Sequence, residues 1–133
     1  MVFGDSSGFI AAFDLRDDQH HAAAQAWHRI VEARERILTT QLVFAETVTH
    51  LRRRAGWEPS RRVGEALLNS RGVEIVELDL AQLCAAWREL LRSGDPKLSL
   101  CDTVSFVVMR ERGIRRALTA DQHFAEAGFE LLF

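Results

Sequence analysis

Hydrophobic positions along the chain follow two different spacings. Five short runs of apolar or β-branched residues are typical of buried strands, and they cover residues 1–4, 37–39, 73–78, 117–119 and 129–133. Between these runs, apolar residues recur every three or four positions, as in Ala23, Trp27 and Ile30, which is the spacing of amphipathic helices. Short strands separated by helices need crossover connections. The pattern therefore predicts an α/β fold with a mostly parallel sheet covered on both faces.

The breaks between these elements are short. Glycine and proline mark them at Gly56 with Pro59, at Gly94 with Pro96, and at three further glycines. None of these breaks is long enough for an interdomain linker. The 133 residues are 47% hydrophobic and 27% charged, which is typical of one globular unit, so we expect a single domain over residues 1–133.

The apolar runs and the two cysteines allow predictions of localisation and redox state. No run approaches the eighteen or so apolar residues of a membrane span, and Asp5 stands where a signal peptide has a positive charge. We therefore expect a cytoplasmic protein. Cys84 and Cys101 both fall within apolar helical patterns, which favours reduced thiols in a core over a disulfide or a zinc site.

Charge is nearly balanced overall but unevenly distributed. The chain has 17 basic and 19 acidic residues and a net charge of −2, which excludes a strongly basic domain that coats nucleic acid. All basic residues except Lys97 are arginine, and they gather at positions 52–54, 61–62 and 110–116. Guanidinium groups bind phosphates bidentately, although a coding bias toward arginine explains the composition equally well.

Three aspartates stand next to predicted strand ends. Asp5 follows the first strand, Asp121 follows the fourth, and Asp102 opens the helix that leads into that strand. In a doubly wound sheet these junctions meet at the carboxyl edge, where ligands bind. Each aspartate also fits a structural role, because Asp5 and Asp121 occupy N-cap positions and Asp102 has capping-box spacing to Ser99.

A fourth acid, Glu46, lies in mid-helix on the side predicted to be buried. Its local partners there are His50 and Arg53. Carboxylates that share one edge repel each other by about 1–4 kcal/mol per pair at roughly 4 Å, so a cluster of four favours a bound cation. Oxygen ligands without paired histidine or cysteine suit Mg²⁺ or Mn²⁺, which serve phosphate chemistry.

Four segments, in order, resemble PIN-domain nucleases and above all the VapC toxins of toxin–antitoxin pairs. They are MVFGDSSGFIAAFD, TTQLVFAETVTHLRRR, LSLCDTVSF and ALTADQHFAEAGFELL, which together span essentially the whole chain. The resemblance implies a three-layer fold in which about seven helices flank a five-stranded sheet. Gly4 departs from the pattern, since the family usually has a branched apolar residue there.

The resemblance also implies a function. Asp5, Glu46, Asp102 and Asp121 correspond to the family's catalytic and metal-binding acids, and Ser6 and Thr119 to hydroxyls beside them. The implied activity is an endoribonuclease dependent on Mg²⁺ or Mn²⁺, in which an activated water attacks a phosphodiester and leaves a 5′-phosphate.

Further residues and partners are also expected. Arg53 is a candidate phosphate contact because it lies on the helix of Glu46. The resemblance implies a cognate antitoxin and a homodimer, with an apolar groove between early helices. His123 is expected to be a solvated side chain rather than a general base. Trp27 and Trp87 are expected in the core, and Trp57 as a stacking or interface residue.

Two other functions remain as alternatives. A receiver domain also gathers acids at a sheet edge, but it needs an acidic neighbour for Asp5 and a lysine after a late strand, whereas Lys97 precedes a helix. A catalytically silent PIN fold that only binds RNA or protein is the second alternative. It has no positive support in a chain that carries all four acids.

Overall fold

The protein is built around one five-stranded parallel sheet. The computed structural model describes residues 1–133, and the strand order is β3-β2-β1-β4-β5 with every neighbouring pair parallel. The strands are β1 (Val2–Gly4), β2 (Ile37–Thr40), β3 (Val73–Val76), β4 (Arg116–Leu118) and β5 (Glu130–Leu131). Each of the five predicted runs overlaps one of them, although β2 ends one residue later and β4 begins one residue earlier than predicted, and this confirms the α/β prediction.

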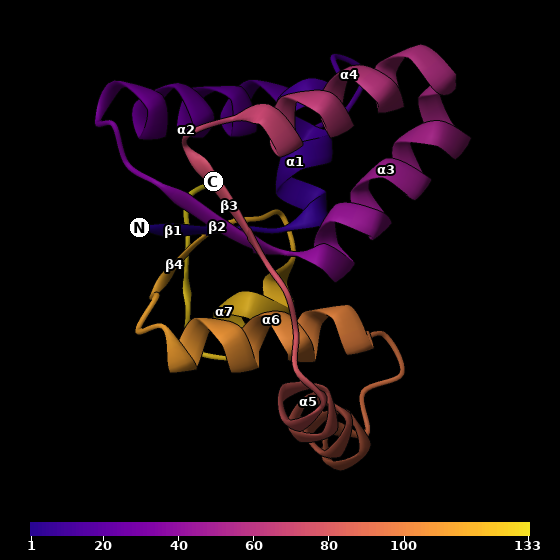
Figure 1. Cartoon of the computed structure of the whole chain (residues 1–133), viewed down its shortest axis with the longest axis vertical. Helices are drawn as coiled ribbons and strands as arrows, with labels where there is room; N and C mark the ends of the chain where they lie inside the picture. Colours follow the sequence, from indigo (N-terminus) through magenta and orange to yellow (C-terminus); the bar gives the residue numbers. More distant parts are fainter.

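Seven helices cover the sheet in two layers. They are α1 (Ser6–Phe13), α2 (His20–Glu32), α3 (Gln41–Ala55), α4 (Trp57–Asn69), α5 (Leu80–Ser93), α6 (Leu100–Glu111) and α7 (Gln122–Glu126). Figure 1 shows α1 to α4 on one face of the sheet and α5 to α7 on the other. None of these helices combines the length and apolar character needed to cross a bilayer.

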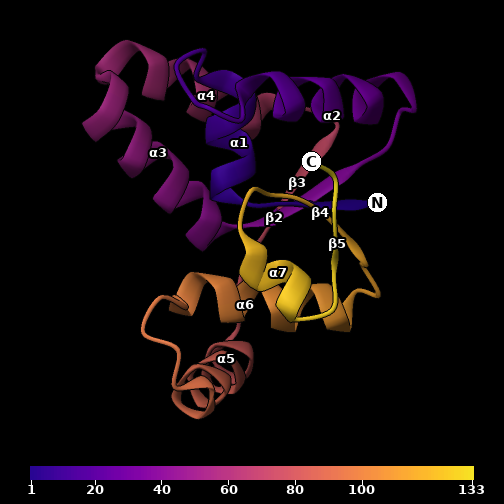
Figure 2. The ribbon, with the colours of Figure 1, turned by 180° about the vertical axis from the view of Figure 1, so that it is seen from behind.

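The strand order brings distant parts of the chain together at the centre of the sheet. The chain runs outward from β1 through β2 to β3 and then returns to add β4 on the other side of β1. The switch point therefore lies between β1 and β4, where the crevice of an open α/β sheet forms. Figure 2 shows the turn from β4 into α7 from behind. Asp5 and Asp121 follow these two central strands.

Close packing under α1 explains the unusual glycine of the first strand. A Cβ on Gly4 would stand 2.3 Å from the Phe9 ring, so the aromatic ring occupies the space that a branched residue fills elsewhere in the family. Phe9 itself is fully buried in the main core, together with Phe3 and Leu38. The departure at Gly4 is thus compensated by packing and leaves the sheet edge unchanged.

Helix α5 corrects two predictions about the core. Cys84 is exposed and Trp87 is 50% exposed, although both fall on an apolar helical pattern. The reason is that α5 packs mainly on α6 and buries only Ala86, so its far side meets solvent. Cys101 is half-buried, and Trp27 is half-buried against Phe9 and Phe13, close to expectation.

Candidate functional site

The adjacent strands β1 and β4 place Asp5 and Asp121 next to each other. The Asp5 amide donates to the Leu118 carbonyl at 3.1 Å, which continues the ladder beyond β1. The Thr119 hydroxyl donates to Asp5 Oδ2 at 2.9 Å and accepts the amide of Asp121 at 3.0 Å. Thr119 therefore joins the two acids, and the structure places it where the sequence predicted a supporting hydroxyl.

Two neighbouring serines support different acids. The Ser7 hydroxyl and amide donate to Asp5 Oδ2 at 2.7 and 3.1 Å, and Ser7 Oγ accepts the Ala120 amide at 3.0 Å. Ser6 instead donates to Glu46 Oε2 at 2.8 Å. Ser7 was not among the predicted site residues. It lies two residues after the N-cap Asp5, a position whose backbone amide and side chain are within reach of the cap carboxylate.

The environment of Glu46 differs from the prediction. Its side chain is exposed, not half-buried, and its partner is Ser6 rather than His50 or Arg53. The buried face of α3 is instead formed by Val43, Thr47 and Leu51. Glu46 therefore faces an open cavity of about 280 Å³ beside the sheet edge, which His50 and Arg54 also line.

Asp102 combines a structural role with proximity to the other acids. It completes the capping box of α6, since its amide donates to Ser99 Oγ at 3.1 Å and its Oδ2 accepts the Ser99 amide at 2.8 Å. The residue is 8% exposed. Burial raises the pKa of Asp102, and the negative charges of Asp121 and Glu46 raise it further. This repulsion shows that three acids from α3, α6 and the β4–α7 turn converge.

The four carboxylates, called the acidic quartet below, share one pattern of hydrogen bonding. In each, the hydrogen bonds from the neighbouring hydroxyl, amide and imidazole groups described above all fall on one oxygen. The oxygens that accept none of these bonds are Asp5 Oδ1, Glu46 Oε1, Asp102 Oδ1 and Asp121 Oδ2. No lysine or arginine forms an ion pair with any of them. The one basic side chain in contact with the quartet is His123, which lies 2.7 Å from Asp121 Oδ1. Oriented carboxylate oxygens with no lysine or arginine beside them fit a hard divalent cation.

Asp5 carries the clearest electrostatic signature of the site. Burial raises the pKa of Asp5 to about 6, against the opposing hydrogen bonds from Ser7 and Thr119, and the charge of Asp102 adds to the rise. Burial also raises the pKa of the Cys101 thiol, which lies close to the charges of Glu46 and Asp5. Ionisation of these groups is therefore energetically unfavourable in the metal-free protein.

The free energy of unfolding of the metal-free protein should fall as the pH rises from about 4 to about 7. The folded-state pKa of Asp5, about 6, lies above its value of 3.8 in the unfolded chain, so the native state holds the proton more tightly. Asp5 alone should lower the free energy of unfolding by about 1.4 kcal/mol between pH 5 and pH 7.5, which corresponds to a decrease of roughly 5 °C in Tm. Thermal unfolding in EDTA at both pH values measures the change. An unchanged or higher Tm at pH 7.5 would contradict it.

His123 is not the solvated side chain that the sequence suggested. Its Nδ1 lies 2.7 Å from Asp121 Oδ1 and its Nε2 lies 3.1 Å from Asp95 Oδ2, so it bridges two carboxylates. Burial lowers the pKa of His123, but the hydrogen bonds and charges of Asp121 and Asp95 outweigh burial and raise it. One ligand atom each of Asp102, Asp121 and His123 lies within 4.8 Å of the others.

Three consecutive arginines of α3, Arg52 to Arg54, have different surroundings. Arg53 is exposed and makes no ion pair, whereas Arg54 lines the cavity of Glu46 and pairs with Asp14 and Asp17. Arg52 lies over the ring of Trp57 at 4.7 Å, and Trp57 is 60% exposed as expected. Arg53 thus remains a free cation on the helix that carries Glu46.

This chain is similar to known proteins in sequence and in fold. A sequence model of the PIN-domain family matches residues 2–130. The chain is 33% identical over 130 residues to the 23S rRNA-specific endonuclease VapC20 of two Mycobacterium tuberculosis strains, covering 97% of this chain and 95% of the relative.

The structural comparison gives the same result. The crystal structure of Mycobacterium tuberculosis VapC20, described as a toxin that cleaves the sarcin–ricin loop, matches with a TM-score of 0.89 and 30% identity over 97% of this chain and 96% of that one. Family model, sequence and fold therefore agree, and the chain belongs to the PIN-domain family of nucleases, in its VapC-type branch.

Proposed function

We propose that the protein is a Mg²⁺- or Mn²⁺-dependent endoribonuclease that acts as the toxin of a toxin–antitoxin pair. One observation carries this proposal: four carboxylates from distant segments meet at the carboxyl edge of the sheet, and each keeps one oxygen outside the hydrogen bonds that orient it. A receiver domain does not fit, because Asp5 has no acidic sequence neighbour and the lysine after a late strand is missing.

The roles of the residues follow from their contacts. The acidic quartet holds the cation, which when bound neutralises phosphate oxygens and makes a water molecule more acidic. Ser7 and Thr119 hold Asp5 Oδ2, so that Oδ1 points away from them toward the site. Ser6 does the same for Glu46. Such supporting hydrogen bonds keep each ligand oriented without a loss of side-chain entropy on binding.

An RNA strand is the substrate that best suits the surroundings of the acids. Arg53 and Arg92, on α3 and α5, are exposed and form no ion pair, so both are available to backbone phosphates. The relative VapC20 is named for 23S rRNA. We therefore propose ribosomal RNA as the first substrate to test and the cytoplasm as the compartment of action.

Cleavage of 23S rRNA and of an isolated stem–loop should appear with Mg²⁺ or Mn²⁺ and disappear with EDTA. Because the proposed attack comes from water and not from the RNA 2′-hydroxyl, the products should carry a 5′-phosphate and ligate without a kinase step. Primer extension and ligation of the new ends measure both features. Cleavage that persists in EDTA would overturn the metal mechanism, and no cleavage of any RNA by folded protein would favour the silent scaffold.

An antitoxin site is proposed on the far side of α1. A cavity of about 270 Å³ lies between α1, α3 and α4, lined by Phe13, Leu15, Leu51, Pro59 and Val63 among others. Leu15 is 81% exposed there. An apolar groove of this kind accepts an amphipathic helix, which is one of the recurring modes of peptide recognition. This groove corresponds to the one expected between early helices.

The homodimer is proposed to form through α5. Leu80, Cys84, Trp87 and Leu91 recur at helical spacing and are all exposed, so they form an uncovered apolar stripe. If two copies of α5 pack antiparallel about a twofold axis, the stripe covers itself. The residues that sequence patterning assigned to a core are thereby buried in the dimer.

Trp87→Glu combined with Leu91→Glu should convert the protein from dimer to monomer, because each change places a charge in the apolar contact. Light scattering coupled to gel filtration measures the mass. Leu68→Glu, at a side chain of α4 that is 62% exposed, is the matched control and should remain dimeric. A short bis-maleimide should crosslink the wild type through Cys84 and fail with Cys84→Ser. A dimer that survives both charges would exclude this face.

A further inference from the structure

We propose that Asp95, His123 and Glu126 form a zinc site next to the acidic quartet and distinct from it; this α7 site does not depend on the proposed nuclease function. His123 and Glu126 lie one turn apart on α7, and Asp95 comes from the loop before α6. One ligand atom of each residue lies within 4.8 Å of the other two. A cation about 2.0–2.2 Å from each ligand needs only small side-chain adjustments to bind all three.

His123 is already oriented as a metal ligand by a residue outside the three. Asp121 Oδ1 lies 2.7 Å from His123 Nδ1, which favours the tautomer with the proton on Nδ1. Asp95 Oδ2 lies 3.1 Å from Nε2 and can only accept, so Nε2 donates to it in the metal-free protein and releases this proton when a cation binds between the two atoms. A carboxylate that holds the second ring nitrogen of a histidine is the usual outer support of zinc-bound histidines.

The two carboxylates of the α7 site are available for a cation. Asp95 Oδ1 accepts the Lys97 amide at 2.9 Å, which fixes the side chain and leaves Oδ2 toward the histidine. Glu126 is exposed and has no hydrogen bond or ion pair in the protein. Buried Phe124, between His123 and Glu126 in sequence, anchors α7 against Phe106 of α6. The ligands therefore stand on a supported helix.

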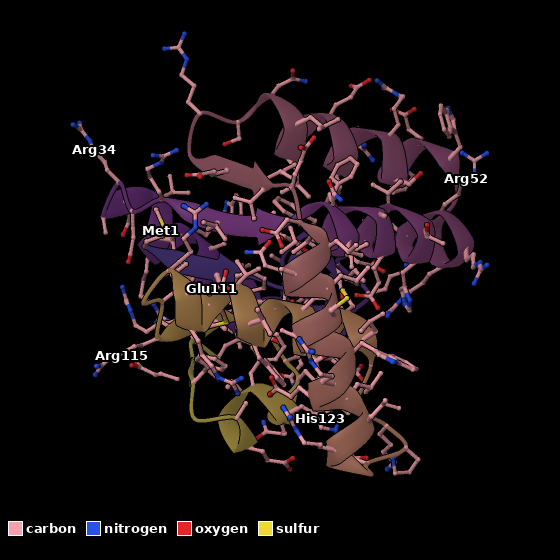
Figure 3. The ribbon with its side chains drawn as sticks, turned by 60° about the horizontal axis from the view of Figure 1, so that its bottom comes forward. Met1, Arg34, Arg52, Glu111, Arg115 and His123 are labelled. Carbon is pink, nitrogen blue, oxygen red and sulfur yellow. The ribbon has the colours of Figure 1, made fainter.

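The surroundings leave room for a water ligand and favour zinc over magnesium. The three residues line a cavity of about 320 Å³, and Figure 3 shows His123 on α7 beside α5, whose Glu89 and Arg92 line the same cavity. Arg110 also lines it, but Glu89 neutralises this guanidinium at 2.8 Å. One imidazole with two carboxylates and an open position matches three-ligand zinc sites, whereas Mg²⁺ prefers oxygen alone.

Zinc at this position connects two separate segments. It ties the loop of residues 94–98 to α7, and it keeps Nδ1 of His123 as the nitrogen that donates to Asp121 Oδ1. The orientation of one member of the acidic quartet is thus set from outside the quartet. His123 acts here as a zinc ligand and a positioning residue for Asp121.

Zinc titration by calorimetry in excess Mg²⁺, which occupies the acidic quartet, tests the α7 site. We expect one Zn²⁺ per chain, and at least tenfold weaker binding in Glu126→Gln and in Asp95→Asn. Glu130→Gln removes the same charge from an exposed glutamate outside the cavity and should bind as the wild type does. Co²⁺ in place of Zn²⁺ should give visible absorption bands that are lost in Glu126→Gln.

Two outcomes would overturn the α7 site. One is wild-type protein that binds no Zn²⁺ when Mg²⁺ is in excess. The other is affinity that is unchanged in both Glu126→Gln and Asp95→Asn while circular dichroism shows folded protein. Asp5→Asn should bind Zn²⁺ normally even if it cleaves no RNA, so the zinc result stands apart from the result of the nuclease assay.

Discussion

Asp5→Asn should lower RNA cleavage by more than about 100-fold and at the same time stabilise the metal-free protein. Loss of groups that only support metal ligands typically costs 10–100-fold, so loss of a ligand charge should cost more. The amide oxygen can still accept from Ser7 and Thr119, which hold Asp5 Oδ2 at 2.7 and 2.9 Å, so the fold is preserved. The buried charge that raises the pKa of Asp5 is removed.

The two effects separate a catalytic role from a structural one. A purely structural aspartate would lose stability on substitution, because a cap hydrogen bond contributes about 1 kcal/mol. Here Tm in EDTA at neutral pH should rise, since burying the charge costs up to about 3 kcal/mol for a pKa shifted to about 6. Addition of Mn²⁺ should raise the Tm of the wild type more than that of Asp5→Asn.

Asp18→Asn is the matched control, because Asp18 is exposed and lies outside the quartet. It should leave both cleavage and Tm unchanged. Cleavage by Asp5→Asn at the wild-type rate would contradict the assignment of Asp5 as a metal ligand. Loss of both cleavage and stability would instead indicate that Asp5 acts mainly as a helix cap.

Gly8→Ala, which adds a single methyl group to α1, should strongly destabilise the protein. A Cβ at Gly8 would stand 2.0 Å from the Leu118 carbonyl oxygen and 2.5 Å from its carbon, both of which are backbone atoms of β4. Relief therefore requires α1 to move away from the sheet. We expect a loss of at least about 3 kcal/mol, which is a Tm decrease of more than roughly 10 °C.

Helix propensity alone predicts the opposite sign, since alanine is favoured over glycine by about 1 kcal/mol inside a helix. Gly64→Ala, in α4, is the matched control because its Cβ would meet only side chains, a Val48 methyl at 3.3 Å and the Phe44 ring at 3.8 Å. That change should be near neutral. Denaturant unfolding of both variants measures the difference, and a Gly8→Ala protein as stable as wild type would mean that α1 does not approach β4 this closely.

The close approach at Gly8 also matters for the site. Asp5 is the N-cap of α1. The Leu118 carbonyl that leaves no room for a Cβ at Gly8 also accepts the Asp5 amide at 3.1 Å. A displaced α1 would therefore separate Asp5 from Thr119. Residual Gly8→Ala protein that folds at low temperature should cleave RNA more slowly than Gly64→Ala.

Much of this protein followed from its amino-acid order alone. The five apolar runs and the helical spacing between them were sufficient for the parallel sheet, because buried strands and amphipathic helices leave different periodicities. The acids at strand ends were predictable as neighbours, since all parallel strands end at one edge. The capping box of Ser99 and Asp102 was readable as well, because it depends on contacts only three residues apart.

Contacts between distant segments were decided only by the tertiary structure. The pairing of Ser6 with Glu46, the support of Asp5 by Ser7 and Thr119, and the bridge from His123 to Asp95 join residues on different elements. Periodicity also assigned Cys84 and Trp87 to a buried face, but the fold provides no element to cover it. A sequence pattern states which residues share a face of a helix, whereas only packing in three dimensions determines what, if anything, lies against that face.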